Sequence, residues 1–136
     1  MKGCRLIEFR IDRRSGIPTY VQLVLQVKQA LRRGDLAVGD KLPTAKDVVS
    51  TLAINPNTVL KAYKELEHDG LAEGRPGLGT FITASLAKAG MAEKTALTQE
   101  LDTWVTHGAS AGLERTDLEA LFAAALDRQF SEPEGP

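Results

Sequence analysis

The sequence predicts a mainly α fold with one small β-hairpin, and two observations carry this prediction. Apolar residues recur at helical spacing in three segments of the first part of the chain and in two segments near its end. The glycine-rich stretch Pro76-Gly77-Leu78-Gly79 separates two short runs that suit β-strands. We therefore expect three helices, a hairpin and two further helices.

Charge divides the 136 residues into two unequal parts. Residues 1–85 carry 13 Lys and Arg against 9 Asp and Glu, whereas residues 86–136 carry 4 against 9. Only the first part is suited to a polyanion such as nucleic acid. We expect one domain over residues 1–85 and a second region, with another task, over residues 86–136.

Composition disfavours several classes of protein and site. Cys4 is the single cysteine, which excludes an intramolecular disulfide and suits an inert thiol in an N-terminal arm; with only His68 and His107 beside it, a zinc site is hard to assemble. No apolar run approaches the ~20 residues of a membrane span, and no signal peptide begins the chain, so we expect a cytoplasmic protein. No catalytic triad, phosphate-binding loop or acidic metal cluster is found, so we expect no enzyme, metal or cofactor.

The first helix is expected to begin at Pro18, which suits the first helical position, and to stop at Gly34. Its core face is formed by Tyr20, Val24, Val27 and Leu31, widened by Val21, Leu23 and Leu25. Before this helix, Phe9 and Ile11 alternate with charged residues, which suits a short strand or an extended arm.

Two more helices follow a connector over residues 35–43. Thr44 and Asp47 fit a capping box at the start of a short second helix, whose exposed first turn offers Thr44 and Lys46. Asn55 is a good N-cap for the third helix, and Pro56 is a good first residue. The buried faces are Val48, Val49 and Leu52 on the second helix, and Val59, Ala62, Tyr63 and Leu66 on the third, which Gly70 ends.

The outer face of the third helix carries a polar stripe. Its members are Asn57, Lys61, Lys64 and His68, beside Thr58. Such a stripe is often only a solvated face. The short helix before it and the hairpin after it favour instead a winged helix-turn-helix that reads DNA.

The hairpin would form the wing. Residues 71–73 and 80–83 suit its strands, and Pro76-Gly77 suits the central pair of a type II turn. Gly79 would allow a close backbone approach, and Arg75 at the tip would meet a phosphate or the minor groove.

At this point the motifs resemble the DNA-binding domain of the GntR superfamily of bacterial regulators, over about residues 9–83. They are Pro18-Thr19-Tyr20, Gly39-Asp40-Lys41-Leu42-Pro43-Thr44, Asn55-Pro56-Asn57-Thr58-Val59, Ala62-Tyr63, Leu66-Glu67 and Gly77-Leu78-Gly79-Thr80-Phe81. The tail of only 51 residues after Ser85 is similar to that of the YtrA subfamily.

The resemblance implies a homodimer on a palindromic operator of double-stranded DNA. It carries DNA contacts over to Thr44 and Lys46, to Asn57 and Thr58, and to the wing from Arg75 through Gly77 to Gly79. Lys46 stands where the family usually has Arg, and Lys lacks the fork that reads guanine, so we expect a phosphate contact there. We expect Asn57 and Thr58 to specify bases, and Lys61, Lys64 and Arg75 to bind phosphates.

The resemblance also implies a transcription regulator, and YtrA-like members often control neighbouring transport operons. Repression is the simpler action, because a dimer on its operator blocks polymerase without further parts. A winged helix used only for protein contacts is the alternative. Fusion to an aminotransferase-like module that holds pyridoxal phosphate would need several hundred more residues.

The tail predicts two amphipathic helices joined by a connector over residues 109–115. The first ends near Gly108, and the second opens with a capping box at Thr116-Asp117-Leu118-Glu119. The apolar positions expected at a dimer interface are Leu97, Leu101, Trp104, Leu118, Leu121, Phe122 and Leu126, with Val105, Ala125 and Phe130 beside them. Packing back on the same chain is the alternative.

A small-molecule effector is not readable from this sequence. Two helices supply little wall for a pocket of ~300 Å³ or more. Trp104 and His107 could line a small site at the dimer interface, but a core tryptophan and a surface histidine are the simpler interpretation.

Overall fold

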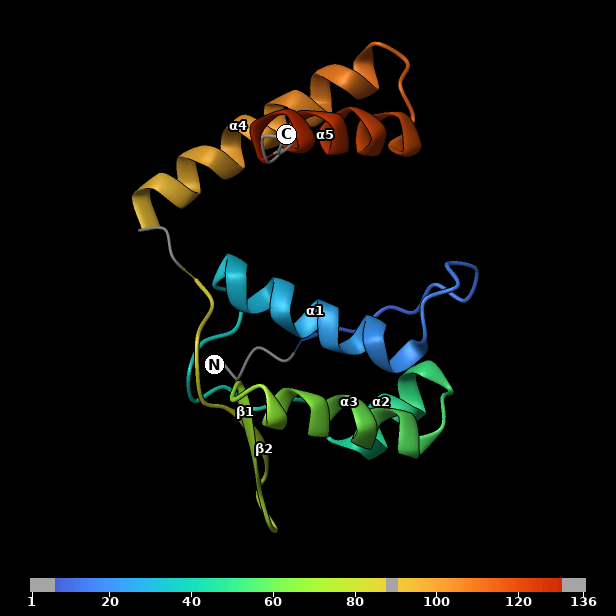
Figure 1. The fold of residues 1–136 in the computed structure, drawn as a ribbon, viewed down its shortest axis with the longest axis vertical. Coiled ribbons are helices and arrows are strands. Elements are labelled where there is room, and N and C mark those ends of the chain that lie inside the picture. The colour runs from blue at the N-terminus through green and yellow to red at the C-terminus, as the bar shows by residue number, and fades with distance from the viewer. Residues whose placement is uncertain (1–6, 88–90, 131–136) are drawn as a thin grey trace, which may run out of the picture. The chain divides into compact units, whose positions relative to one another are not determined.

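A computed structural model of the chain describes residues 7–87 and 91–130 (Figure 1). The expectation for Cys4 lies outside these residues. The chain divides into two compact units, Met1–Lys88 and Ala89–Pro136. In the part of the chain that the structure describes, no helix is long and apolar enough to cross a membrane.

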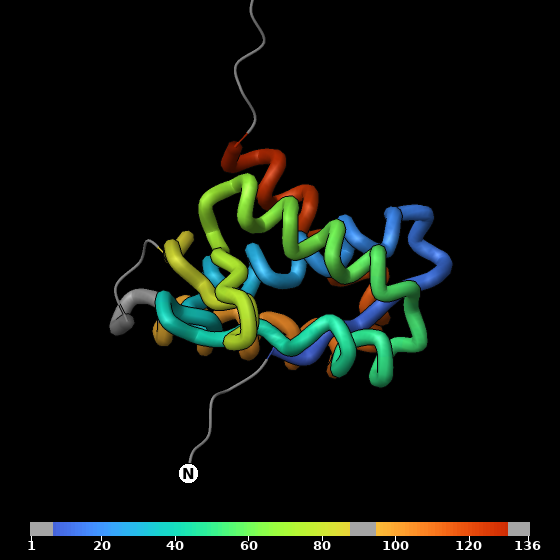
Figure 2. Tube along the Cα trace, turned by 90° about the horizontal axis from the view of Figure 1, so that it is seen from below, coloured from blue at the N-terminus to red at the C-terminus, as the bar shows by residue number. Residues whose placement is uncertain are grey.

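The first unit is built on three helices and one hairpin. In chain order they are α1 (Thr19–Arg33), α2 (Ala45–Leu52), α3 (Pro56–His68), β1 (Ala72–Arg75) and β2 (Gly79–Ile82). The helix α3 contacts both α1 and α2 (Figure 1), and Figure 2 shows α2 leading into α3 through a short turn. The largest fully buried side chains are Leu23, Val27, Leu31, Leu42, Val59, Leu66 and Ile82. One apolar core thus joins every element of this unit.

The ends of α1 are close to those expected from the sequence. Gly34 has a φ of 82° and ends the helix, and the N–H of Asp35 then donates to the carbonyl of Ala30 at 2.9 Å. Pro18 is the N-cap and not the first helical residue, because its backbone is extended while its carbonyl already accepts from the N–H of Gln22 at 3.1 Å. Leu25, expected to widen the buried face, is exposed.

The connector before α2 holds a short run of sheet that the sequence did not indicate. The N–H of Leu42 donates to the carbonyl of Thr80 at 2.9 Å, and the N–H of Ile82 donates to the carbonyl of Asp40 at 2.8 Å. Residues 39–42 therefore pair with β2 on the edge that β1 leaves open, with Lys41 opposite Phe81. This pairing fixes the base of the hairpin to the core.

The N-terminal arm is extended and is held by glutamine side chains of α1. Gln26 exchanges two hydrogen bonds with the backbone of Arg10, at 2.9 and 2.6 Å, and Gln22 does the same with Asp12, at 2.8 and 3.0 Å. Each amide side chain thus makes the paired hydrogen bonds to the arm's backbone that a neighbouring strand would otherwise make. No hydrophobic pattern signals such a contact, which explains why the arm's partner was not predicted.

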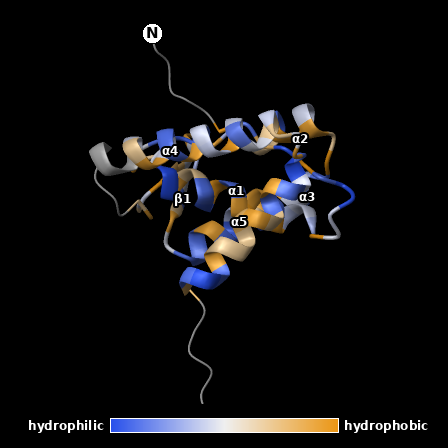
Figure 3. Cartoon of the chain, turned by 90° about the horizontal axis from the view of Figure 1, so that it is seen from above, coloured by the Kyte–Doolittle hydropathy of each residue, from blue (hydrophilic) through white to orange (hydrophobic). Residues whose placement is uncertain are grey.

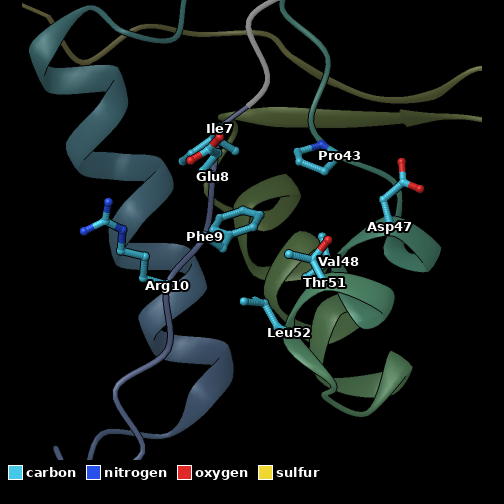
Figure 4. Close-up of a pocket in the computed structure, with 9 residues that line it drawn as sticks. All are labelled: Ile7, Glu8, Phe9, Arg10, Pro43, Asp47, Val48, Thr51 and Leu52. Atoms are coloured by element: carbon cyan, nitrogen blue, oxygen red, sulfur yellow. The ribbon is translucent and has the colours of Figure 1, made fainter.

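The arm also closes one side of a cavity of about 710 Å³ against α2. Figure 4 shows Phe9 pointing from the arm toward Val48 and Leu52 on α2, while Arg10 points away from them. Phe9 is buried, and it belongs to the same apolar core as Val48. The arm is therefore part of the folded unit.

The second unit consists of α4 (Met91–Ser110) and α5 (Arg115–Phe130). The helix α4 ends near Gly108, as predicted, with Ser110 as its last residue. Gly108 itself lies within the helix where Leu118 of α5 crosses: a Cβ at Gly108 would lie 2.4 Å from Leu118 Cδ2. Gly112, which follows the helix, has a φ of 91°. The missing side chain thus serves helix packing.

The start of α5 also differs from the expected capping box. The carboxylate of Asp117 accepts from the N–H of Glu114 at 2.8 Å, and the N–H of Leu118 donates to the carbonyl of Glu114 at 3.1 Å. The helix therefore begins one residue before Thr116, at Arg115, with Glu114 as its cap, because Asp117 reaches back three residues to that N–H.

Candidate nucleic-acid interface

The first turn of α2 presents Thr44 and Lys46 to solvent. The hydroxyl of Thr44 accepts from the N–H of Asp47 at 3.1 Å, as predicted, which begins the helix at Ala45. The reciprocal bond, from the N–H of Thr44 to the Asp47 carboxylate, is not found among the described residues. Lys46 is exposed one position into the helix.

A buried tyrosine of α3 holds this turn in place. The hydroxyl of Tyr63 donates to the carbonyl of Pro43 at 2.5 Å, one residue before Thr44. Burial raises the pKa of this hydroxyl above its ordinary value of 10.0, and the nearby negative charge of Asp47 raises the pKa further. The phenol therefore keeps its proton at neutral pH and acts as a permanent donor.

The turn between α2 and α3 depends on an unusual backbone conformation. Ala53 has a φ of 55°, in the left-handed region that alanine rarely adopts, and its N–H donates to the carbonyl of Val49 at 2.8 Å. The sequence has no Gly or Asn at this position that would signal the conformation. Just beyond the turn, a hollow of about 460 Å³ is lined by Lys46, Val49, Ser50 and Pro56, which brings the exposed side of α2 beside the start of α3.

The start of α3 agrees with the prediction. The side chain of Asn55 accepts from the N–H of Asn57 at 2.8 Å, and Pro56 has no N–H to satisfy. Asn57 is exposed, whereas Thr58 is half-buried. Of these two predicted base-reading residues, Asn57 is the more accessible.

The two lysines of the polar stripe differ in their surroundings. Lys61 places its Nζ 4.1 Å from the centre of the Tyr20 ring on α1, a cation–π contact that draws it toward α1. Lys64 and His68 are exposed farther along the helix. The stripe is therefore one surface with Lys61 on its α1 flank.

The wing turn has the predicted geometry. Leu78 N–H donates to the carbonyl of Arg75 at 2.9 Å around Pro76 and Gly77, and Gly77 has a φ of 77°. A Cβ on Gly79 would lie 2.6 Å from Cε of Lys41, so Gly79 does allow a close approach, by a lysine that sequence reasoning had not placed here. The Lys41 side chain therefore brings a cation beside Gly79, next to the wing turn.

Arg75 was predicted at the tip of the wing. It lies just before the tip, as the last residue of β1, and is paired with Gly79 across the hairpin. Its Nε lies 3.2 Å from a carboxylate oxygen of Glu73, and its guanidinium lies 4.8 Å from the centre of the Phe81 ring. Neighbouring strand residues thus orient the guanidinium, because the register of the hairpin puts all three side chains on one face. Both ionic groups are about half exposed, so this pair contributes little stability.

A carboxylate of α3 fastens the wing. Glu67 accepts from the N–H of Gly74 at 3.1 Å, which ties the middle of β1 to the last turn of α3. The sequence marked Glu67 only as part of a motif and assigned it no contact. Its bond identifies the flank of α3 that the wing lies against.

The residues predicted for a dimer interface all lie on α4 and α5, and all but Leu118 are exposed. Trp104 and Phe122 have ring centres 6.5 Å apart. The exposed fractions of the exposed large apolar side chains of these helices run from 37 % at Trp104 to 74 % at Phe130. Trp104 is therefore not a core residue of this unit, contrary to the simpler interpretation, and His107 is exposed. Figure 3 shows hydrophobic residues along α5.

The described residues offer no alternative centre of metal chemistry. No group of three or more His, Cys, Asp or Glu side chains is placed to hold a metal ion among residues 7–87 and 91–130. The polar and cationic side chains described above lie on α2, α3 and the wing.

The sequence is similar to those of known bacterial regulatory proteins. The family model for bacterial regulatory proteins of the gntR family matches residues 19–82. The chain is 38 % identical over 107 residues to YtrA of Bacillus subtilis (strain 168), described as an HTH-type transcriptional repressor, covering 77 % of this chain and 82 % of YtrA. These relatives are transcription regulators and not enzymes, in agreement with the expectation from the sequence.

Two solved structures are similar over most of their length. One is a transcriptional antiterminator from Listeria monocytogenes EGD-e, with a TM-score of 0.57, 27 % identity, and coverage of 96 % of this chain and 98 % of that one. The other is YtrA from Sulfolobus acidocaldarius, a GntR-family transcription factor, with a TM-score of 0.52, 25 % identity, and coverage of 70 % and 97 %. The predicted fold class, a winged helix-turn-helix followed by C-terminal helices, is confirmed.

Proposed function

The chain belongs to the GntR family of bacterial regulatory proteins, and from this premise we propose that it binds a palindromic operator as a homodimer and represses a neighbouring operon, such as one for transport. DNA-binding regulation of transcription is the activity of the family. The operator, the dimer and the regulated operon are parts of the proposal. A protein with this task acts in the cytoplasm, where the DNA is.

One observation carries the proposal: hydrogen bonds join both the turn before α2 and the wing to α3, and a third bond begins α3 itself. Tyr63 holds the turn before α2, Asn55 begins α3, and Glu67 ties the wing to α3. A surface that reads DNA must hold its contacts in fixed geometry, since base and phosphate positions are fixed by the duplex. This common frame supports DNA reading over a merely solvated face.

Within this frame we assign two kinds of contact. Asn57 reads a base edge, with Thr58 beside it on the partly covered flank of α3. Lys46, Lys64 and Arg75 bind phosphates, and Gly77 and Gly79 let the wing backbone approach the duplex. Lys61 also meets a phosphate, with its stem held by the Tyr20 ring.

For the second region we propose dimerisation. The α4–α5 pair has no buried side chain among residues 95–130, although it carries Leu97, Leu101, Leu121, Phe122 and Leu126. Apolar surface of this extent is typical of a pair of helices that is covered by a partner, and a second copy matches the two-fold symmetry of a palindrome. The division into a DNA-binding domain over residues 1–85 and a dimerisation region over 86–136 is part of this proposal.

The proposal is tested by selecting binding sites for the full-length protein from a randomised pool of duplex DNA. We expect one inverted repeat, with half-site centres about one helical turn apart, ~34–36 Å. A protein-interaction module would enrich no sequence, and that result would contradict the proposal.

Two variants then separate specificity from general affinity. Asn57→Ala should weaken binding to the selected operator by about 1–3 kcal/mol with little loss on random DNA. Arg75→Ala, the matched control, should weaken binding to both and reduce the salt dependence by about one ion. Equal losses on both DNAs for Asn57→Ala, measured by fluorescence anisotropy, would remove base reading from this residue.

A further inference from the structure

Leu60 is the one large apolar side chain of α3 that the core does not bury. It is 51 % exposed, whereas Val59, Ala62, Tyr63 and Leu66 of the same helix are all buried. It is also absent from the partly buried side chains that pack against the core. Core packing therefore does not explain a leucine here, where a polar residue would be better hydrated.

The helical positions place Leu60 on a particular flank of the exposed face. Residues three, four and seven apart lie close together on a helix, so Leu60 lies one turn from Asn57 and from Lys64 and in line with Glu67. Glu67 bonds to the wing at Gly74, whereas Lys61, the next residue after Leu60, turns toward Tyr20 of α1. Leu60 thus lies on the wing side of the polar stripe, between the proposed base-reading Asn57 and the proposed phosphate-binding Lys64.

The chemistry of the major groove limits what such a side chain can recognise. A leucine has no donor or acceptor, and covering a polar base edge without bonding it is unfavourable. The C5-methyl group of thymine is the apolar feature of a base edge in that groove. A methyl group against a leucine side chain removes apolar surface of both from water.

We propose that Leu60 is a specificity-determining residue that recognises the C5-methyl group of one thymine in each half-site. The proposal rests on the proposed function, since it requires α3 to lie in the major groove of an operator. It adds to that function a reader that works without hydrogen bonds, beside the hydrogen-bonding Asn57. An exposed leucine kept for contact with another protein is the competing explanation.

The experiment uses the full-length protein and the operator selected from the randomised pool. Each thymine of the half-site is replaced in turn, symmetrically in both half-sites, by deoxyuridine, which lacks the methyl group but keeps every hydrogen-bonding atom. For the wild-type protein we expect one position at which deoxyuridine weakens binding by about threefold to fivefold per half-site, the effect of losing one buried methyl group. At the same position, Leu60→Ala should bind thymine and deoxyuridine within about twofold of each other.

The matched control is Leu25→Ala, the same substitution at an exposed leucine of α1. It should retain the full preference for thymine. Thermal unfolding followed by circular dichroism should give Leu60→Ala a melting temperature close to that of the wild type, because about half of the side chain is exposed to solvent.

Three results would overturn the inference. If the wild-type protein binds equally well with deoxyuridine at every position, it makes no contact with a thymine methyl group. If Leu60→Ala keeps the preference for thymine, another residue makes that contact. If the wild-type protein selects no site at all, the proposed function fails, and the role of Leu60 fails with it. The first two results leave the proposed function standing, so the two failures are distinguishable.

Discussion

The two units of this chain use apolar residues in opposite ways. In the first unit, leucines, valines and Ile82 from all three helices and the hairpin lie within one core at exposures near zero. In the second, the leucines and aromatic rings of α4 and α5 other than Leu118 keep more than a third of their surface, and only Gly108 and Leu118 are partly buried among residues 95–130. Two helices alone cannot enclose their apolar faces, whereas three helices and a hairpin can enclose a common core. The first unit is therefore expected to be stable alone, and the second to depend on a partner.

The largest effect should come from cutting into the buried core of the first unit. Leu66→Ala removes a fully buried side chain where α3 meets the core, and should lower the free energy of unfolding by about 2–5 kcal/mol. Urea denaturation followed by the near-ultraviolet signal of the tyrosines reports on this unit. Leu25→Ala, at an exposed position, should change it by less than about 1 kcal/mol; equal effects of the two would contradict the contrast between core and surface.

A smaller effect, confined to dimerisation, is expected when a charged side chain is introduced into the second unit. Leu121→Glu should weaken dimerisation by about 2–3 kcal/mol, because an unpaired carboxylate would be placed against apolar side chains, while leaving the first unit folded. Sedimentation equilibrium measures the dissociation constant. Ala120→Glu, on the opposite side of α5, should leave it nearly unchanged.

If the second unit serves only dimerisation, its removal should leave the first unit folded. Cutting the chain after Ser85 should leave a folded monomer that holds a half-site only weakly, because two linked contacts become two separate ones. Intact protein that is monomeric at micromolar concentration, or truncated protein that binds the full operator as tightly as the intact chain, would end the proposed role of residues 91–130.

The smallest effect concerns a polar bond within the first unit. Tyr63→Phe removes the donor to the carbonyl of Pro43 and should cost about 1–2 kcal/mol of stability at pH 7. The pKa of Tyr63 is raised in the folded protein, so its contribution is fully present below the ordinary tyrosine pKa of 10.0 and declines as the pH rises above it. Denaturation at pH 8 and pH 11 should therefore show a smaller loss with pH for Tyr63→Phe than for the wild type. Parallel losses would mean that this hydroxyl does not carry the effect.

Local signals were sufficient for most of the first unit. Thr44, Asn55 and Pro56 begin their helices, Gly34 and Gly70 end theirs, and Gly77 forms the wing turn at the predicted places. Each of these residues acts through its own backbone or through an atom within three residues, so the sequence by itself determined the starts of α2 and α3, the polar stripe and the hairpin.

Only the tertiary structure decided the contacts between separate elements. The pairing of residues 39–42 with β2, the glutamine contacts to the arm, the bond from the wing to Glu67 and the crossing of Leu118 over Gly108 each join two different segments of the chain. Polar side chains that bond to distant backbone leave no periodic trace in a sequence, and a glycine that admits a neighbouring helix looks the same as one that ends its own. The core residues could therefore be predicted from their spacing. The contacts that place α2, α3 and the wing beside one another could not.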